Sequence, residues 1–206
     1  MSMLHVGLTG NIAVGKSCVS ARFTELGAFV IDADHVAHEL FDYGTPTYKR
    51  VVEAFGHDII HENGTINRTT LGDIVFTSEE KRLLLNSIVH PAVHEAISQK
   101  IAERETTTPD GIIIVDAALL VETGRHGEYD RLIVIACDAA QQLERLMSRD
   151  HLSEKAAKAR IAAQMPMMEK IRLADYVIDT SGTFDSTRKQ VENVYRKLLQ
   201  FSSNIS

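Results

Sequence analysis

The strongest constraint on the fold is the segment 10–17, GNIAVGKS, which matches the pattern G-x-x-x-x-G-K-[ST] of a phosphate-binding loop. An apolar run at 4–9 precedes it and a helical pattern at 17–26 follows it, which is the strand–loop–helix order that such a loop requires. Glycines let the backbone approach phosphate oxygens, and N–H groups of the loop and of the first helical turn then surround the anion. The sequence therefore predicts a nucleoside triphosphate site.

The amino-acid type at each position of the loop indicates the role expected of that residue. Lys16 is expected to reach the β- and γ-phosphates, and the Ser17 hydroxyl is expected to bind Mg²⁺. The predicted nucleotide site consists of Gly10, Asn11, Ile12, Ala13, Val14, Gly15, Lys16, Ser17 and Cys18. The loop does not identify the group that accepts the phosphate.

Five short apolar runs are typical of buried strands in a parallel sheet. They lie at 4–9, 28–32, 112–116, 132–137 and 176–179. Helical patterns at 17–26, 138–149 and 186–199 alternate with them, the second with Asp138 as its N-cap. This alternation predicts a doubly wound α/β fold.

A long interval, about 35–109, interrupts the alternation because it contains no convincing strand. Helices are predicted there at about 45–55, 69–75, 78–88 and 91–105. Ligands of open α/β sheets bind at the carboxyl ends of the strands. We therefore expect this helical insertion to lie where substrates bind.

Composition excludes several classes of function. A net charge of −6 disfavours sequence-independent binding to nucleic acid, which needs a basic face. Cys18 and Cys137 support neither a disulfide framework nor a four-ligand zinc site. No apolar stretch is long enough to span a membrane, and the N-terminus does not resemble a signal peptide. We expect a cytoplasmic protein without nucleic-acid or membrane partners.

Aspartates follow two of the predicted strands. Asp32 and Asp34 end the second run, where a carboxylate can act as the base for an acceptor hydroxyl. Asp34 can equally be the N-cap of a helix that begins at His35, and the pattern alone does not decide. Asp116 ends the third run, so it is either a metal-binding aspartate or a simple strand-end residue.

Two histidine pairs, His57 with His61 and His90 with His94, have the i, i+4 spacing of helical metal ligands. No cysteine or third histidine stands near either pair in the sequence. Surface or helix-start histidines are therefore the favoured interpretation.

The whole set of motifs resembles the dephospho-CoA kinase family. The resemblance begins with residues 7–10, 15–17 and 31–34 and extends through most of the chain. Its later motifs lie at 68–76, 85–91, 116–122, 142–150, 160–164 and 174–179. Each motif alone is weak or moderate evidence, whereas their order and spacing together are highly specific.

The resemblance implies that ATP phosphorylates the ribose 3′-hydroxyl of dephospho-CoA in the last step of coenzyme A biosynthesis. It implies Asp34 as the base, and Asp32 as a support for that base or for the metal site. Arg145 and Arg149, four residues apart, are implied as stabilisers of the transferring phosphoryl charge. From the pattern alone, a solvated charged face is the favoured interpretation.

ATP and Mg²⁺ are the implied co-substrate and cofactor, with Ser17 and Asp116 as candidate metal ligands. The candidate acceptor-binding residues are Asp32, Asp34, Arg68, His90, Leu119 and Leu120. We expect a monomer or weak homo-oligomer. Two alternatives stay open, namely a P-loop kinase for another small molecule (a nucleoside, nucleotide or sugar acid) and a non-catalytic nucleotide-binding regulator.

The implied architecture is a P-loop NTPase-type three-layer sandwich with a parallel five-stranded sheet, in a single domain over 1–206. Its core covers about 1–34, 110–147 and 172–206, its acceptor-binding helical insertion about 35–109, and its short helical lid about 148–171.

The chain departs from the usual family pattern around the loop. Asn11 and Ala13 replace glycines, Val14 replaces a small residue, and Cys18 replaces a common threonine. Thr180 replaces a usual asparagine in a loop that we expect near the adenine. The phosphate-contacting glycines and Lys16 remain, so nucleotide binding is expected to survive.

Overall fold

The computed structural model describes residues 3–205 and divides into two compact units. The first unit contains the chain up to Asp32 and from Arg104 onward, and the second is Ala33–Glu103. Among the described residues, no helix combines the length and apolar character needed to cross a membrane.

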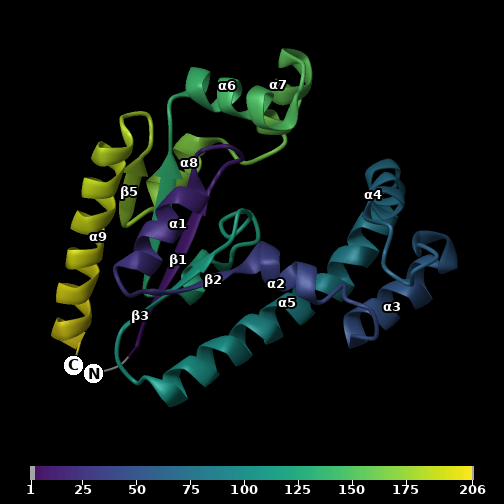
Figure 1. Ribbon diagram of the computed structural model, residues 1–206, viewed down its shortest axis with the longest axis horizontal. Helices are drawn as coiled ribbons and strands as arrows, with labels where there is room; N and C mark the ends of the chain where they lie inside the picture. The colour runs from purple at the N-terminus through teal and green to yellow at the C-terminus, as the bar shows by residue number, and fades with distance from the viewer. Residues whose placement is uncertain (1–2, 206) are drawn as a thin grey trace. The chain divides into compact units, whose positions relative to one another are not determined.

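A five-stranded sheet forms the centre of the first unit (Figure 1). All neighbouring strands are parallel, in the order β2-β3-β1-β4-β5. The strands are β1 (Leu4–Gly10), β2 (Phe29–Asp32), β3 (Ile112–Asp116), β4 (Arg131–Ala136) and β5 (Tyr176–Asp179). The five predicted strands are thus confirmed to within one residue at each end.

Helices cover both faces of this sheet. They are α1 (Lys16–Glu25) and α9 (Phe184–Ile205) on one face and α8 (Met167–Leu173) on the other. The first unit also contains α6 (Ala139–Asp150), α7 (Glu154–Ala162) and a 3₁₀ turn η2 (Arg125–Glu128). Ile133 and Ile135 of β4 join a buried cluster with side chains of α1 and α9. Leu132 and Val134 join a second cluster with side chains of α8. Because alternate strand residues point to opposite faces, this division confirms the three-layer arrangement.

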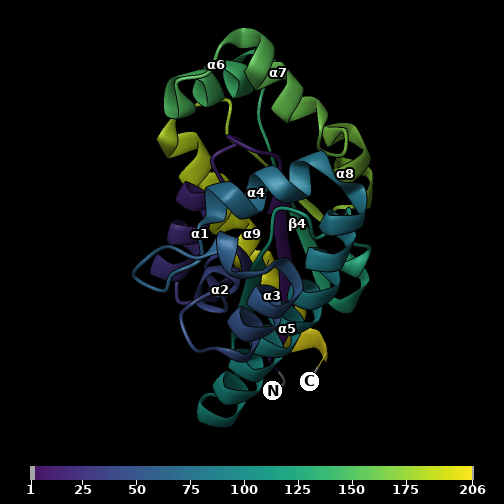
Figure 2. The ribbon, with the colours of Figure 1, turned by 90° about the vertical axis from the view of Figure 1, so that its right-hand side faces the viewer.

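Helices α6 and α7 lie side by side at one end of the first unit, as the two views agree (Figure 1 and Figure 2). The Asp138 carboxylate accepts hydrogen bonds from the N–H groups of Ala140 and Gln141, which confirms Asp138 as the N-cap of α6. His151 follows α6 with a φ of 53°, and this left-handed residue separates α6 from α7.

A buried ion pair fastens α8 to the segment that follows β3. The fully buried Lys170 ammonium lies 2.7 Å from Glu122 Oε1 and donates to the Ala118 carbonyl oxygen at 3.0 Å. The Thr9 hydroxyl, from β1, donates to the same carbonyl at 3.1 Å. A buried ammonium group is tolerated only when it is paired and hydrogen-bonded, so these contacts fix the position of α8.

The second unit is helical, with a small core of its own. Its elements are α2 (Ala33–Glu39), α3 (Pro46–Phe55), η1 (His57–Ile59), α4 (Arg68–Thr77) and most of α5 (Glu79–Thr107). The Thr45 side chain accepts from the Tyr48 N–H, and the Asn67 side chain accepts from the Thr70 N–H. These caps explain where α3 and α4 begin.

The helices predicted at 78–88 and 91–105 are one continuous helix, α5, so the break predicted at Pro91 is wrong. Proline removes one backbone donor and usually bends a helix. Here Pro91 lies near the middle of 29 residues, and the turns on both sides keep their own hydrogen bonds. The other turns of this long helix therefore maintain its conformation despite the one hydrogen bond lost at Pro91.

Candidate active site

The phosphate loop joins β1 to α1 in the first unit, as predicted. Ala13 and Gly15 have φ values of 62° and 91°. Glycine adopts this left-handed conformation freely, whereas alanine there costs about 1–2 kcal/mol. At Gly10, an added Cβ would lie 2.7 Å from the Ile135 carbonyl oxygen. The sharp course of the loop therefore depends on glycine at 10 and 15 and is strained at Ala13.

Lys16 is held at the carboxyl end of β3. Its Nζ lies 2.5 Å from Asp116 Oδ1, and the Ser20 hydroxyl donates to Asp116 Oδ2 at 2.7 Å. Asp116 is only 4% exposed, so its charge is removed from water and is compensated by Lys16. Asp116 therefore interacts directly with the side chain that the loop motif predicts to bind phosphates.

Asp32 and Asp116 are register partners on the adjacent strands β2 and β3. Register partners project to the same face, so their side chains share one edge of the sheet. Asp116 is buried and Asp32 is exposed. These carboxylates, like the hydroxyl of Ser17 at the start of α1, are oxygen donors, the type that Mg²⁺ takes when phosphates complete its coordination.

No group of three or more histidine, cysteine, aspartate or glutamate side chains among residues 3–205 is arranged to hold a metal ion. The histidine pairs 57/61 and 90/94 are therefore not part of such a group. The donor set at the sheet edge fits a metal that is held mainly by nucleotide phosphates rather than by a protein cage.

Arg145 is tied to the phosphate loop through Thr180. The guanidinium donates to Thr180 Oγ1 at 3.1 Å and to the Thr180 carbonyl oxygen at 2.8 Å. The Thr180 hydroxyl in turn donates to the Val14 carbonyl oxygen at 2.7 Å. The threonine that replaces the usual asparagine thus connects α6, the end of β5 and the loop.

A cavity of about 200 Å³ opens beside the loop. Gly15, Cys18, Arg145, Thr180, Gly182, Phe184 and Thr187 line it. It combines a glycine of the loop with the arginine of α6 and the segment after β5. Such a concave site, with a cation and hydroxyl groups, can hold part of a nucleotide.

Arg149 lies further along α6 and contacts Asp150. Its Nε donates to Asp150 Oδ1 at 2.7 Å, while Arg160 of α7 donates to Asp150 Oδ2 at 2.9 Å. The hydrogen bond from Arg149 holds the pKa of Asp150 below its usual value. Both arginines are more than half exposed, so the structure places two cations at the surface of α6 and α7.

The candidate residues of the second unit are all exposed. Asp34 is the second residue of α2, so its interpretation as the N-cap is wrong, because the helix begins one residue earlier, at Ala33. Arg68 begins α4, donates to the His38 carbonyl oxygen at 3.3 Å and lies over the Phe41 ring at 5.3 Å. His90 lies on α5 beside Pro91.

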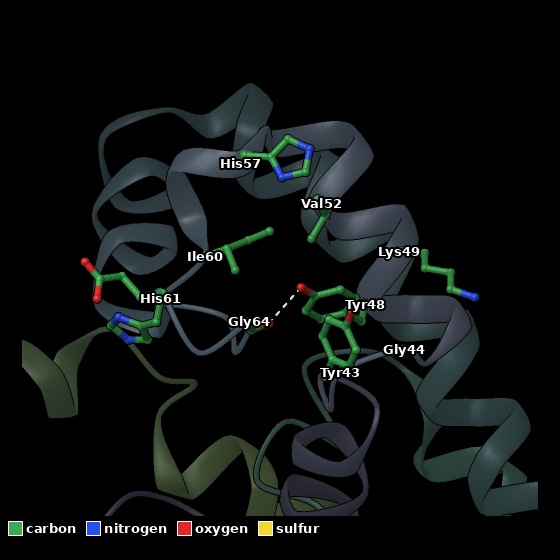
Figure 3. A pocket seen from close by; sticks show the side chains of 10 residues that line it. Tyr43, Gly44, Tyr48, Lys49, Val52, His57, Ile60, His61 and Gly64 are labelled. Carbon is green, nitrogen blue, oxygen red and sulfur yellow. Dashed lines mark hydrogen bonds between the residues drawn. The ribbon is translucent and has the colours of Figure 1, made fainter.

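The second unit contains a further cavity, of about 680 Å³ (Figure 3). Tyr43 and Tyr48 meet edge to face with ring centroids 5.4 Å apart, and the Tyr48 hydroxyl donates to the Gly64 carbonyl oxygen at 2.7 Å. The Lys49 side chain extends away from the two tyrosines (Figure 3). None of the predicted acceptor-binding residues lines this cavity.

Leu119 and Leu120 differ in exposure. Leu119 is 50% exposed, whereas Leu120 is buried. An added Cβ at Gly7 would lie 2.6 Å from Leu120 Cδ2, so Leu120 packs closely on β1. Of the two leucines, only Leu119 presents a large surface to solvent.

Sequence reasoning missed several residues that contact the loop or its partner Asp116. Ser20 binds Asp116, Gln142 donates to the Ile12 carbonyl oxygen, and Gln164 accepts from the Ile12 N–H. A signal existed for the two glutamines, because both belong to motifs of the family resemblance. Ser20 follows Lys16 by one helical turn, and that spacing is its only signal.

The sequence of this chain is similar to those of known kinases. The sequence model of the family described as Dephospho-CoA kinase matches residues 4–186. A dephospho-CoA kinase of Bacillus cereus is 44% identical over 194 residues, which cover 93% of this chain and 96% of that protein.

Solved structures are similar as well. A crystal structure of a protein from Thermus thermophilus has a TM-score of 0.81 at 26% identity and covers 96% of this chain and 99% of that chain. Dephospho-CoA kinase from Campylobacter jejuni has a TM-score of 0.72 at 27% identity, with 99% and 100% covered. The family match extends over most of the chain and includes the phosphate loop. The chain therefore belongs to the dephospho-CoA kinase family.

Proposed function

We propose that this chain transfers the γ-phosphoryl group of ATP to the ribose 3′-hydroxyl of dephospho-CoA, giving coenzyme A and ADP. The observation that carries this proposal is the 44% identity to a dephospho-CoA kinase over 93% of the chain, together with the loop that positions Lys16 beside Asp116. These findings favour the implied acceptor over the two alternatives left open by the sequence.

The nucleotide is proposed to bind along residues 10–18, with loop N–H groups directed at the phosphates. Lys16 would leave Asp116 and contact the β- and γ-phosphates. The cavity beside Gly15 is suited to the nucleoside part of ATP, and Arg145 is placed to contact the nucleotide there. The positive charge of Arg145 would also stabilise the negative charge on the transferring phosphoryl group.

Mg²⁺ is proposed to accompany ATP. Ser17 and Asp116 would hold it, and Asp32 lies on the same sheet edge as Asp116. The ion would neutralise charge on the phosphates. Release of Lys16 toward the phosphates would leave Asp116 Oδ1 accessible as an oxygen donor, directly or through water.

Asp34 is proposed to accept the proton of the 3′-hydroxyl. As that oxygen bonds to the γ-phosphorus, the bond from phosphorus to the β–γ bridging oxygen breaks and ADP leaves. Arg149 is proposed to stabilise the negative charge on the transferring group after leaving Asp150. Arg68, His90 and Leu119 are proposed as acceptor contacts, whereas the buried position of Leu120 favours a packing role.

The direct test is ADP release by the purified chain with Mg-ATP, with and without dephospho-CoA. We expect turnover that depends on dephospho-CoA, and a product that carries the new phosphate on the 3′-oxygen. A panel of nucleosides, nucleotides and sugar acids serves as the control for acceptor choice. Equal turnover with another acceptor would contradict the proposal, as would the absence of turnover with dephospho-CoA while ATP still binds.

The cytoplasmic location of the protein and its state as a monomer or weak homo-oligomer stay predictions.

A further inference from the structure

Two glutamine side chains hold the backbone of Ile12 in the phosphate loop, one at its N–H and one at its carbonyl oxygen. Gln164 Oε1 accepts a hydrogen bond from the Ile12 N–H at 2.7 Å. Gln142 Nε2 donates to the Ile12 carbonyl oxygen at 2.8 Å. Beside them, Asn11 Nδ2 donates to the Met165 carbonyl oxygen at 3.1 Å. Gln142 and Asn11 are 6% and 4% exposed, so these bonds are largely shielded from water.

The glutamines lie on either side of α7 in the sequence. Gln142 is on α6, before the segment 148–171 that is predicted to be the lid, and Gln164 is within that segment, between α7 and α8. Residues before and after α7 therefore both bind the backbone of Ile12. Movement of α6 and α7 must either preserve these bonds or break them.

The backbone conformation at Ile12 matters because the strained residue Ala13 follows it. A non-glycine residue in the left-handed region persists only where its surroundings determine the backbone. The bonds to Ile12 provide such surroundings. Asn11 adds a third link, to Met165, that the glycine usual at this position in the family cannot make.

We propose that Gln142 and Gln164 are positioning residues that couple the conformation of α6 and α7 to the shape of the phosphate loop. They touch the loop backbone rather than substrate, and they fix the two peptide groups that flank Ile12 in the orientation that lets the following N–H groups bind phosphate. This inference rests on the proposed function only for its turnover measurements, because ATP binding and amide exchange test it independently.

The two glutamines have opposite hydrogen-bonding roles, and this provides a sharp test. A carboxylate only accepts hydrogen bonds, so Gln164→Glu keeps the acceptor for the Ile12 N–H. Gln142→Glu loses the donor and places a carboxylate against the Ile12 carbonyl oxygen. Both variants bring the same charge to the loop, so the difference between them reports hydrogen-bond polarity.

The measurements are the Kd for Mg-ATP by calorimetry, kcat and KM for ATP, and hydrogen exchange of the Ile12 amide by NMR. Loss of one such bond in Gln164→Leu should raise the Kd about fivefold to tenfold and speed Ile12 exchange. Gln164→Glu should restore slow exchange, and Gln142→Glu should bind ATP more weakly than Gln164→Glu. Gln200→Leu, on the exposed surface of α9, is the matched control.

Unchanged Ile12 exchange and ATP affinity in Gln164→Leu would overturn the inference, as would equal behaviour of the two glutamate variants. Should Gln164→Leu fail to fold, the comparison of the two glutamate variants still decides. Failure of the proposed function would look different, because the wild-type chain would then bind ATP without phosphorylating dephospho-CoA.

Discussion

The candidate residues of the two units are held in different ways. In the first unit, Lys16 and Arg145 bond to Asp116 and Thr180, partners that are 100 and 35 residues away in the sequence. In the second unit, Asp34, Arg68 and His90 are exposed. The contact that Arg68 makes with the His38 carbonyl oxygen is local to that helical unit.

This difference suggests that the two substrates meet surfaces with different degrees of organisation. Side chains held by packing and by long-range hydrogen bonds are positioned before a ligand arrives. Exposed side chains become ordered with their ligand, at an entropic cost. We therefore expect substitutions in the first unit to act on nucleotide affinity and rate together, and substitutions at Asp34 to act mainly on rate.

The largest expected effect is that of Asp34→Asn. Loss of a positioned base typically lowers kcat by about 10²–10⁴-fold. ATP affinity should be unchanged, because Asp34 is not part of the loop. The measurement is kcat with dephospho-CoA beside the Kd for Mg-ATP, with exposed Asp42→Asn as the control. A near wild-type rate in a folded Asp34→Asn protein would remove its assigned role.

Lys16→Ala tests the candidate residues of the first unit. We expect kcat to fall about 10²–10³-fold, because a preorganised charge on the phosphates is lost. The Kd for Mg-ATP should rise as well, which distinguishes this variant from Asp34→Asn. Lys197→Ala, exposed on α9, is the control. Unchanged ATP affinity would show that Lys16 stays with Asp116 when the nucleotide binds.

Arg149 sharpens the comparison because it lies in the first unit and yet is exposed. Arg149→Ala should lower kcat by about 10- to 100-fold, less than Asp34→Asn, because solvent and salt screen an exposed cation. Steady-state kinetics at low and high salt measures this effect. Arg196→Ala on α9 is the matched control, and a loss no greater than in that control would assign Arg149 to a solvated surface.

The smallest effect concerns the two thiols. Cys18 is exposed and lines the cavity beside Gly15, whereas burial raises the pKa of Cys137 above its usual value. Thiolates are the reactive form, so alkylation of Cys137 should become fast only above the pKa of about 8.5 of a free thiol. Mass spectrometry of alkylated protein should show Mg-ATP slowing Cys18 a few-fold.

Cys18→Ser provides the control for that experiment, because it leaves Cys137 as the only thiol. Mg-ATP should not change the alkylation rate of Cys137 in this variant. Equal protection of both cysteines would indicate a change of the whole unit rather than occupation of the cavity.

Much of the fold could be predicted from the sequence because local patterns carry it. Buried apolar runs identified the five strands, and Asp138 identified the start of α6. The division predicted between residue 88 and Pro91 was wrong, because the helix continues through the proline. The N-cap interpretation of Asp34 was wrong by two residues, because α2 begins at Ala33 rather than at His35.

The contacts of the candidate site were much less predictable. The loop motif identified Lys16 by type, but its bond to Asp116 depends on two strands pairing over 100 residues of chain. The hydrogen bonds of Gln142 and Gln164 depend likewise on how α6 and α8 return to the loop. Side-chain partners of this kind follow from tertiary packing, to which neither periodicity nor a short motif is sensitive.

The fully buried Lys170 gives this enzyme an internal reporter of its own breathing motions. An amine-reactive reagent can acylate the Lys170 side-chain nitrogen only after α8 separates from Glu122 and the Ala118 carbonyl and the ammonium group loses a proton, because the folded state leaves no surface for the reagent to reach. Surface lysines would label at once, whereas Lys170 would label at the rate at which this region opens. Its labelling kinetics would thus time rare local unfolding in the native protein without any engineered probe.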